Sequence, residues 1–306
     1  MSYAAAAMLA APLIPYITLP EIPLVPQGLL GGFPPMPLSI KPFGLLVATG
    51  IILASRMTIA RGRRIGLDER AMTSFIIWSV GIGLVGGHVF DVLWYYPERL
   101  VRDPWILLRL WDGLSSFGGF TGSVIGMALW WLKHRVPLLP YADNFMALLP
   151  VGWAFGRAGC SIVHDHPGVR SDAWLAVQYP GGGRFDLGLL ELMFTLLLLV
   201  LFLWWGRAPR PWGFFSTVAC LSYAPVRFAL DFLRERSAGA GDVHGAIDPR
   251  YGYLTPAQWE CFLLLALGIV LLRRLQRAIE SGRGFEPATV PKAFQAPGAQ
   301  PSNAQA

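Results

Sequence analysis

Charged side chains are scarce in this chain. Only 14% of its 306 residues are Asp, Glu, Lys or Arg, whereas soluble domains carry roughly 25%. Hydrophobic residues make up 54% of the chain, and the mean hydropathy is +0.47. A soluble fold is excluded because there are too few polar side chains to cover a surface that faces water. We therefore expect a protein whose surface lies largely in lipid.

Paired cysteines, internal repeats and nucleic-acid-binding patterns are also lacking. The three cysteines, Cys160, Cys220 and Cys261, form no CxxC pair and lie in or at apolar segments, which argues against a disulfide framework. The absence of a repeat gives no support to a transporter built from two matched halves. The net charge is +6, but no basic run alternates with aromatic residues in a polar setting, so nucleic acid is not an expected partner.

What the chain does contain is a series of apolar runs. A helix needs about 20 mostly apolar residues to cross the hydrocarbon core of a bilayer. We expect an all-α, polytopic membrane protein with about seven transmembrane helices. The runs lie at 43–60, 73–95, 117–133, 142–160, 187–206, 213–233 and 255–275.

The basic residues predict the orientation, since Lys and Arg favour the inner face. With the N-terminus outside, fourteen of the 25 Lys and Arg fall in the inner connections and nine in the outer ones. The remaining two, Arg157 and Arg227, lie within apolar runs. We therefore predict that the N-terminus is outside and the C-terminus inside.

The runs divide the chain into three parts. Residues 1–42 are apolar and Pro-rich without the basic start of a signal peptide, and we expect an arm lying at the outer interface. The transmembrane domain spans 43–275, and its outer loops at 96–116, 161–186 and 234–254 form a small head. The tail 276–306 is rich in Pro, Ala and Gln and is predicted to be a disordered inner segment.

Ionisable residues at membrane depth are functional candidates, because they are costly there. Arg157 lies near the outer end of the fourth run, and it either snorkels to water or meets a ligand that its small neighbours Gly156 and Gly159 allow to approach. Arg227 and Asp231 are four residues apart on one helix face, a spacing that suits a structural pair. Arg234 follows, and two arginines with one acid leave a positive face that suits phosphate.

Two further groups are weaker signals. Glu191 opens the fifth run and Gln258 the seventh, where the bland interpretation of each is a helix cap or a residue of the outer rim. Cys160, His164, Asp165 and His166 form a cluster with three interpretations: a metal site, which His88 or His244 could complete, a base–acid pair, or a polar turn.

Seven motifs lie between about residues 35 and 275. They are "GGHVFDVLWYYPE", "DPWILLRLWDG", "SSFGGFTG", "GRAGCSIVHDHPG", "LGLLE", "YAPVRFALDFLRE" and "LTPAQW". Together, and in this order, they resemble the prolipoprotein diacylglyceryl transferases of bacterial inner membranes. The family signature has the form GRxGNFxNGExxG, which Gly156, Arg157, Gly159 and Gly168 match, and Asp165 replaces its glutamate. Arg227, Asp231, Glu191 and Gln258 correspond to further family positions.

This resemblance implies an enzyme that transfers a diacylglyceryl group from phosphatidylglycerol to the lipobox cysteine thiol of a prolipoprotein and releases glycerol 1-phosphate. It also implies a monomer in the bacterial inner membrane, with no cofactor or metal and with the site facing the periplasm. The signal peptide of the prolipoprotein and the bilayer are the expected partners. Arg157 and Arg227 would bind the phosphodiester. The expected substrate-binding set adds Asp231, Glu191, Gln258, Gly156, Gly159, Gly168 and Arg234.

The chain departs from the family where a histidine is expected. The family has an HGG motif entering the third span, and here Phe117 stands in place of the histidine. Cys160, Val163, His164 and Phe43 replace other typical residues. We hypothesise that His164 or His166, oriented by Asp165, takes over the proton-accepting role. Two alternatives are a degenerate relative that binds lipid or precursor without chemistry, and a metal-dependent membrane hydrolase that uses Cys160, His164 and His166.

Overall fold

A computed structural model describes residues 14–25, 38–110, 113–235 and 250–282. The chain divides into two compact units. Unit 1 comprises Met1–Ala54, Leu148–Ala208 and Cys220–Leu267, and unit 2 comprises Ser55–Ala147, Pro209–Ala219 and Gly268–Ala306.

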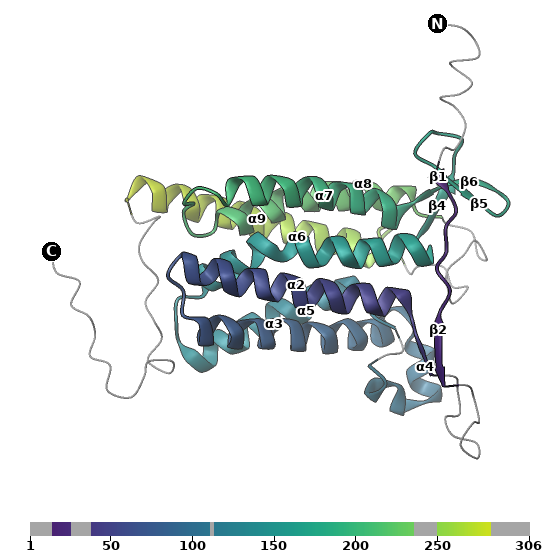
Figure 1. The fold of residues 1–306 in the computed structure, drawn as a ribbon, viewed down its shortest axis with the longest axis horizontal. Coiled ribbons are helices and arrows are strands. Elements are labelled where there is room, and N and C mark those ends of the chain that lie inside the picture. Colours follow the sequence, from purple (N-terminus) through teal and green to yellow (C-terminus); the bar gives the residue numbers. More distant parts are fainter. Residues whose placement is uncertain (1–13, 26–37, 111–112, 236–249, 283–306) are drawn as a thin grey trace, which may run out of the picture. The chain divides into compact units, whose positions relative to one another are not determined.

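Long helices dominate the structure, and each of the seven predicted apolar runs lies on one of them (Figure 1). They are α2 (Pro42–Arg64), α3 (Glu69–Phe90), α5 (Ser116–His134), α6 (Leu138–Val163), α7 (Leu187–Trp205), α8 (Phe214–Leu230) and α9 (Pro256–Glu280). α2, α6, α8 and α9 each contribute residues to both units. The prediction of a mostly helical fold is therefore confirmed.

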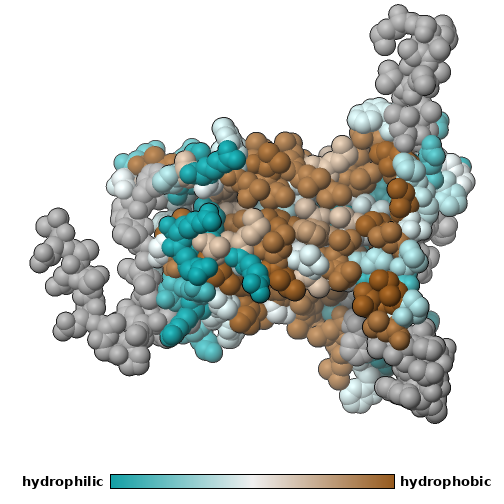
Figure 2. All heavy atoms as spheres, in the orientation of Figure 1, coloured by the Kyte–Doolittle hydropathy of each residue, from teal (hydrophilic) through white to brown (hydrophobic). Residues whose placement is uncertain are grey.

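Within the part of the chain that the structure describes, four helical segments are long and apolar enough to cross a membrane: Pro42–Arg64, Glu69–Tyr95, Leu138–Val163 and Leu187–Trp205. The second of these continues α3 through a turn of π-helix, η1 (Asp91–Tyr95). α7 has the highest mean hydropathy, 2.5. Figure 2 shows apolar side chains over the sides of the helices and hydrophilic ones gathered nearer their ends. Length, composition and surface together identify a membrane protein.

Close helix contacts in unit 1 depend on glycine. A Cβ atom on Gly50 of α2 would lie 2.6 Å from the Cβ of Phe155 on α6. A Cβ on Gly188 of α7 would lie 2.9 Å from the Cβ of Cys160, also on α6. Small residues let helix backbones approach closely in lipid, so these glycines bring α2 and α7 against α6.

A small sheet lies at one end of the unit 1 helices (Figure 1). Its strands are in the order β1 (Ile14–Pro15), β5 (Val177–Tyr179), β6 (Gly182–Asp186) and β4 (Pro167–Arg170). β1 is parallel to β5, whereas β6 is antiparallel to both β5 and β4. The all-α prediction is incomplete here, because the 161–186 loop contains three short strands. A separate antiparallel pair joins β2 (Ile22–Val25) to β3 (Leu38–Ile40).

Unit 2 is built on the pair α3 and α5. Backbone contacts between them are so close that a Cβ on Gly86 would lie 2.7 Å from the carbonyl oxygen of Gly118. Phe75, Trp130 and Tyr141 form the centre of a buried apolar cluster in this unit. The predicted 96–116 loop contains α4 (Pro97–Arg102) and the 3₁₀ helix η2 (Pro104–Leu108). Buried His88 contacts the carbonyl oxygens of Ile106 and Gly113 at 2.8 and 3.1 Å.

The predicted ends of the chain fall partly outside the described residues. α9 continues to Glu280, beyond the predicted boundary at 275. The described residues do not include 1–13, 26–37, 236–249 and 283–306. The predicted disorder of the tail therefore stays a prediction, and most of the predicted 234–254 loop lies outside the described residues.

Replacing Gly86 with leucine should destabilise unit 2, because the side chain would meet the backbone of α5 at Gly118 and Gly122. Overpacking of this kind costs about 1–3 kcal/mol. The measurement is the melting temperature of the detergent-purified protein. Gly81→Leu is the matched control on the same helix, since nothing lies within 4 Å of its Cβ position. Equal melting temperatures of the two variants would contradict the close α3–α5 contact.

Candidate functional site

The centre of the candidate site is a buried ion pair between α6 and α7. Arg157 Nη2 lies 2.9 Å from Glu191 Oε1, and the two side chains are only 3% and 2% exposed. The guanidinium of Arg157 also stacks over the ring of Trp153, with Cζ 4.6 Å from the ring centroid. Arg157 therefore does not snorkel to water, which was the structural alternative for this residue.

The same carboxylate reaches α8. Tyr223 donates its hydroxyl to Glu191 Oε1, and Arg227 Nε lies 3.9 Å from Glu191 Oε2. Glu191 is thus shared by residues of two other helices. The two arginines that the sequence singled out meet at one acid, Glu191. Its position in the sequence alone marked it as a cap or rim residue, whereas the family resemblance placed it in the substrate-binding set.

A second buried carboxylate extends the network to the start of α9. Asp231 lies in the 3₁₀ turn η3 (Asp231–Leu233), which follows α8 directly. Its Oδ1 accepts a hydrogen bond from Arg227 Nη1 at 2.7 Å and lies 3.5 Å from Arg234 Nε. Its Oδ2 accepts a hydrogen bond from the hydroxyl of Thr255. The predicted Arg227–Asp231 pair is therefore present, but it belongs to a larger network.

Gln258 holds the start of α9 in place. Its Oε1 accepts from the Thr255 backbone N–H at 3.1 Å, and its Nε2 donates to the Phe228 carbonyl at 3.3 Å. It is fully buried, and it holds Thr255, which in turn donates a hydrogen bond to Asp231.

In the network as a whole, three guanidiniums face two carboxylates. The charges come from Arg157, Arg227, Arg234, Glu191 and Asp231, which leaves one excess positive charge.

The three glycines of the expected site have different surroundings. Nothing lies within 4 Å of the Cβ position of Gly156, whereas a Cβ on Gly159 would lie 2.8 Å from the ring of Phe43. Gly168 forms an isolated β-bridge with Arg234. A Cβ there would lie 2.9 Å from the carbonyl oxygens of Leu233 and Phe185. Gly168 thus allows the loop after α6 to lie against the segment after α8.

His164 does not pair with Asp165, contrary to the hypothesis that Asp165 orients it. It follows α6 with φ of +52°, and its Nδ1 contacts Asp186 Oδ2 at 2.6 Å. Its Nε2 lies 3.1 Å from the Ile17 carbonyl oxygen, and its ring stacks on Tyr16 with the centroids 4.0 Å apart. His164 therefore ties the N-terminal strand to the small sheet.

Asp186, which contacts His164, also makes two other hydrogen bonds. Its Oδ1 caps α7 by accepting from the Leu189 N–H at 2.9 Å. Its Oδ2 also accepts from the Tyr179 hydroxyl at 2.8 Å. Burial, reinforced by the charge of Asp186, raises the pKa of Tyr179, so the phenol keeps its proton and remains a donor. An aspartate immediately before an apolar run is a recognisable N-cap, but its second role depends on the tertiary fold.

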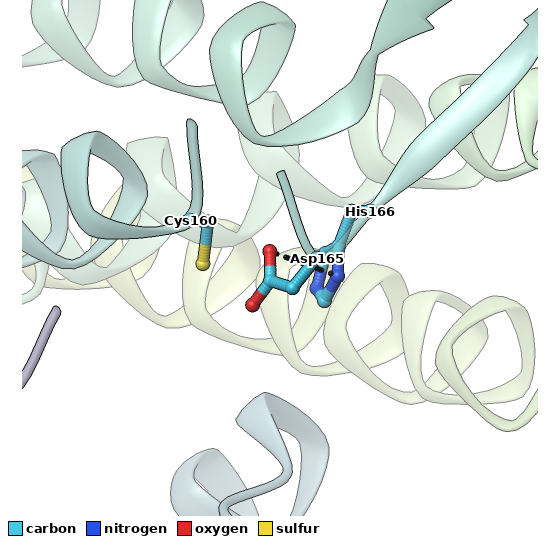
Figure 3. A group of neighbouring side chains, drawn as sticks. All are labelled: Cys160, Asp165 and His166. Atoms are coloured by element: carbon cyan, nitrogen blue, oxygen red, sulfur yellow. Dashed lines mark ion pairs between the residues drawn. The ribbon is translucent and has the colours of Figure 1, made fainter. Parts of the chain in front are cut away.

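His166, unlike His164, faces the site. Its Nδ1 lies 3.2 Å from Asp165 Oδ1, and the two side chains are about three-quarters buried. Cys160 Sγ joins them, and the three ligand atoms lie within 4.8 Å of one another (Figure 3). Burial raises the pKa of Asp165 to about 6. Burial and nearby Arg234 and Arg157 hold the pKa of His166 well below its usual range, so its imidazole is neutral near pH 7.

This cluster adjoins the ion-pair network. Arg157 Nη1 lies 3.8 Å from Cys160 Sγ, while Nη2 of the same guanidinium holds Glu191. A neutral imidazole, a carboxylate and a thiol therefore lie next to a buried cation. This combination can accept a proton and hold an anion at adjacent positions.

Comparison with known proteins agrees with the motif order. The family model for prolipoprotein diacylglyceryl transferase matches residues 33–274. The chain belongs to this family. A phosphatidylglycerol–prolipoprotein diacylglyceryl transferase of Pseudoalteromonas atlantica is 32% identical over 238 residues, which is 76% of this chain and 82% of the relative. The transferase of Chromohalobacter salexigens is 30% identical over 240 residues, 77% of this chain and 88% of the relative.

The match to the prolipoprotein diacylglyceryl transferase model includes all the long helices except the last residues of α9. Sequence reasoning missed three residues that contact the predicted ones: Tyr223 contacts Glu191, Thr255 contacts Asp231, and Asp186 contacts His164. Tyr223 lies four residues before Arg227, on the same face of α8, and this spacing was an available signal. Thr255 gave no such signal, because its role depends on the position of Asp231.

Replacing His164 with alanine should release the N-terminal strand, since both ring contacts and the stack on Tyr16 are lost together. Hydrogen exchange at Tyr16 and Ile17 should then increase by at least about tenfold, because one lost hydrogen bond is worth about 1 kcal/mol and this variant loses two. Tyr179→Phe removes one bond to Asp186 and leaves the Ile17 contact, so it should change exchange less. Unchanged exchange in His164→Ala would contradict the anchoring role.

Proposed function

We propose that this chain transfers the diacylglyceryl group of phosphatidylglycerol to the lipobox cysteine thiol of prolipoproteins, with glycerol 1-phosphate as the leaving group. The observation that carries the proposal is the shared contact of Arg157 and Arg227 with Glu191. It brings two guanidiniums from different helices to one point. Relatives that match most of the chain have this activity in their names.

The charge of the network suits a phosphodiester. The headgroup of phosphatidylglycerol carries one negative charge at its phosphodiester, and the network has one excess positive charge. A guanidinium has five N–H donors, more than one carboxylate can use, so holding Glu191 leaves donor capacity for a phosphate oxygen. Charge-assisted contacts of this kind are strong where water is excluded.

The reaction replaces one bond with another at the sn-3 carbon of the diacylglyceryl group. The thiolate sulfur of the acceptor attacks this carbon and forms a C–S bond. The bond from the same carbon to the phosphate oxygen breaks, and glycerol 1-phosphate leaves with that electron pair. Arg157 and Arg227 stabilise the charge that develops on the leaving phosphate. A free thiol has a pKa of about 8.5, so the site must also promote its deprotonation.

The pair His166 and Asp165 provides a group for that second task. Phe117 carries no ring nitrogen and cannot fill the role of the family's histidine. His166 is neutral, lies beside a carboxylate, and belongs to the same unit as Arg157. We assign His164 a positioning role instead, because both of its ring nitrogens are occupied by Asp186 and the Ile17 carbonyl.

The finer topology is part of the same proposal. We infer seven spans, one for each of the long helices, with the N-terminus outside and the C-terminus inside. The candidate site then faces the periplasm of a bacterial inner membrane, the 1–42 arm and outer loops form a head there, and the protein acts as a monomer. The excess of Lys and Arg in the inner connections supports this orientation.

Arg157→Lys and Arg227→Lys should each lower transfer to a lipobox peptide by about 10²- to 10³-fold, as expected for loss of an oriented donor. The measurement is the mass of the peptide after incubation with purified protein and phosphatidylglycerol vesicles. Arg170→Lys is the control, since Arg170 is exposed. Binding of phosphatidylglycerol by the wild-type chain without release of glycerol phosphate would instead establish a lipid-binding relative without chemistry.

His166→Ala should lower the rate of transfer by about 10²- to 10⁴-fold, the usual contribution of a proton-transferring group. His164→Ala should cost much less, provided that the sheet still forms. The rates of both variants are measured with the peptide assay, and circular dichroism checks their folding. A full rate in a variant that carries both His164→Ala and His166→Ala would show that neither histidine takes part.

A further inference from the structure

The cluster of Cys160, Asp165 and His166 contains three different potential metal ligands. A thiol, a carboxylate and an imidazole converge there within 4.8 Å (Figure 3). Asp165 and His166 are contributed by the short loop after α6, and Cys160 by the last turn of that helix. His164, between them in sequence, points to Asp186 and is not part of the group.

Two of these residues present buried atoms without a hydrogen bond in the described part of the chain. Asp165 Oδ1 and His166 Nδ1 are both shielded from solvent, and neither makes a hydrogen bond of good geometry there; they contact each other as an ion pair. Buried polar atoms nearly always have a partner. Because the two atoms lie only 3.2 Å apart, a single cation would satisfy both.

We infer that Cys160, Asp165 and His166 bind one zinc ion and that the acceptor thiol of the substrate becomes its fourth ligand. The sulfur and nitrogen ligands favour zinc over calcium or magnesium. Three protein ligands with an open fourth position are typical of catalytic zinc. Ligand atoms of a tetrahedral zinc ion lie about 3.5 Å apart, so a contraction of roughly an ångström in the observed group would complete the shell.

The surrounding charges are compatible with a divalent cation. Thiolate and carboxylate ligands together neutralise a zinc ion. The guanidiniums near the cluster each contact a carboxylate. Arg157, whose Nη1 lies 3.8 Å from the sulfur, contacts Glu191, and both Arg227 and Arg234 contact Asp231. The guanidinium of Arg157 is also the proposed phosphate contact, so a thiol bound to the metal would lie next to the bound headgroup.

This inference rests on the proposed transfer reaction and specifies how the thiol is activated. A thiol that coordinates zinc loses its proton, which passes to solvent, and the thiolate then attacks the sn-3 carbon as described above. In this scheme His166 and Asp165 assist the deprotonation as ligands of the metal, and this replaces the direct proton transfer described under the proposed function. The metal lowers the pKa of the bound thiol, which Phe117 cannot do.

The first experiment measures binding without any lipid. The purified full-length protein, with any affinity tag removed, is depleted with a chelator and titrated with Co²⁺ as a spectroscopic substitute for zinc. We expect one ion per chain, a thiolate-to-cobalt absorption band, and displacement by Zn²⁺. Cys160→Ser should lose the band and bind at least about 100-fold more weakly, since even an outer-shell partner is worth 10- to 100-fold.

The other two free cysteines provide matched controls. Cys220→Ser and Cys261→Ser should keep the band, because these buried cysteines lie outside the group. His166→Ala and Asp165→Asn should each weaken binding while circular dichroism stays unchanged, which separates loss of a ligand from misfolding. Absence of the band in the wild type, or equal binding by wild type and Cys160→Ser, would overturn the inference.

The second experiment distinguishes the metal from the transfer reaction itself. A lipobox peptide should strengthen the thiolate band of the Co²⁺ protein, whereas a peptide with serine in place of the cysteine should not. Chelated protein should transfer at least about 100-fold more slowly until Zn²⁺ is restored. A full rate in the chelated protein would refute the zinc inference and leave the proposed function intact. Metal binding through Cys160 with no transfer under any condition would refute the proposed function instead.

Discussion

The carboxylate of Glu191 is the interaction on which unit 1 depends. It receives Arg157 from α6, and Tyr223 and Arg227 from α8. A buried guanidinium without a counter-charge is strongly unfavourable, since removal of one partner of a buried pair costs about 3–5 kcal/mol. The need to neutralise these charges therefore sets how α6, α7 and α8 pack together.

Asp231, four residues after Arg227, is a second buried carboxylate that contacts two arginines. It receives Arg227 and Arg234, and Thr255 connects it to the start of α9. The two carboxylates share Arg227, so the network is continuous across four helices. Because cations outnumber acids in it, the network stabilises the fold and still attracts an anion. The same arginines therefore hold the helices together through the two carboxylates and carry the positive charge that would bind an anion.

The loop after α6 combines two different tasks in neighbouring residues. His164 takes the left-handed conformation and turns its ring to Asp186 and Tyr16. Asp165 and His166 turn instead toward Cys160. Cys160, His164 and Asp165, which differ from the family signature, are therefore divided between the attachment of the N-terminal strand and the cluster beside Arg157.

Hydropathy in the sequence determined the helices, because each run must satisfy its backbone hydrogen bonds internally in lipid. Arg157 and Arg227 could also be identified, since charge at membrane depth is costly and so rarely incidental. The sequence also grouped Cys160, His164, Asp165 and His166. Only the tertiary structure decided that the two arginines share Glu191 and that His164 leaves this group to contact the sheet. Those partnerships join residues far apart in the chain, or depend on one backbone turn at residue 164. Local sequence patterns carry no information about either.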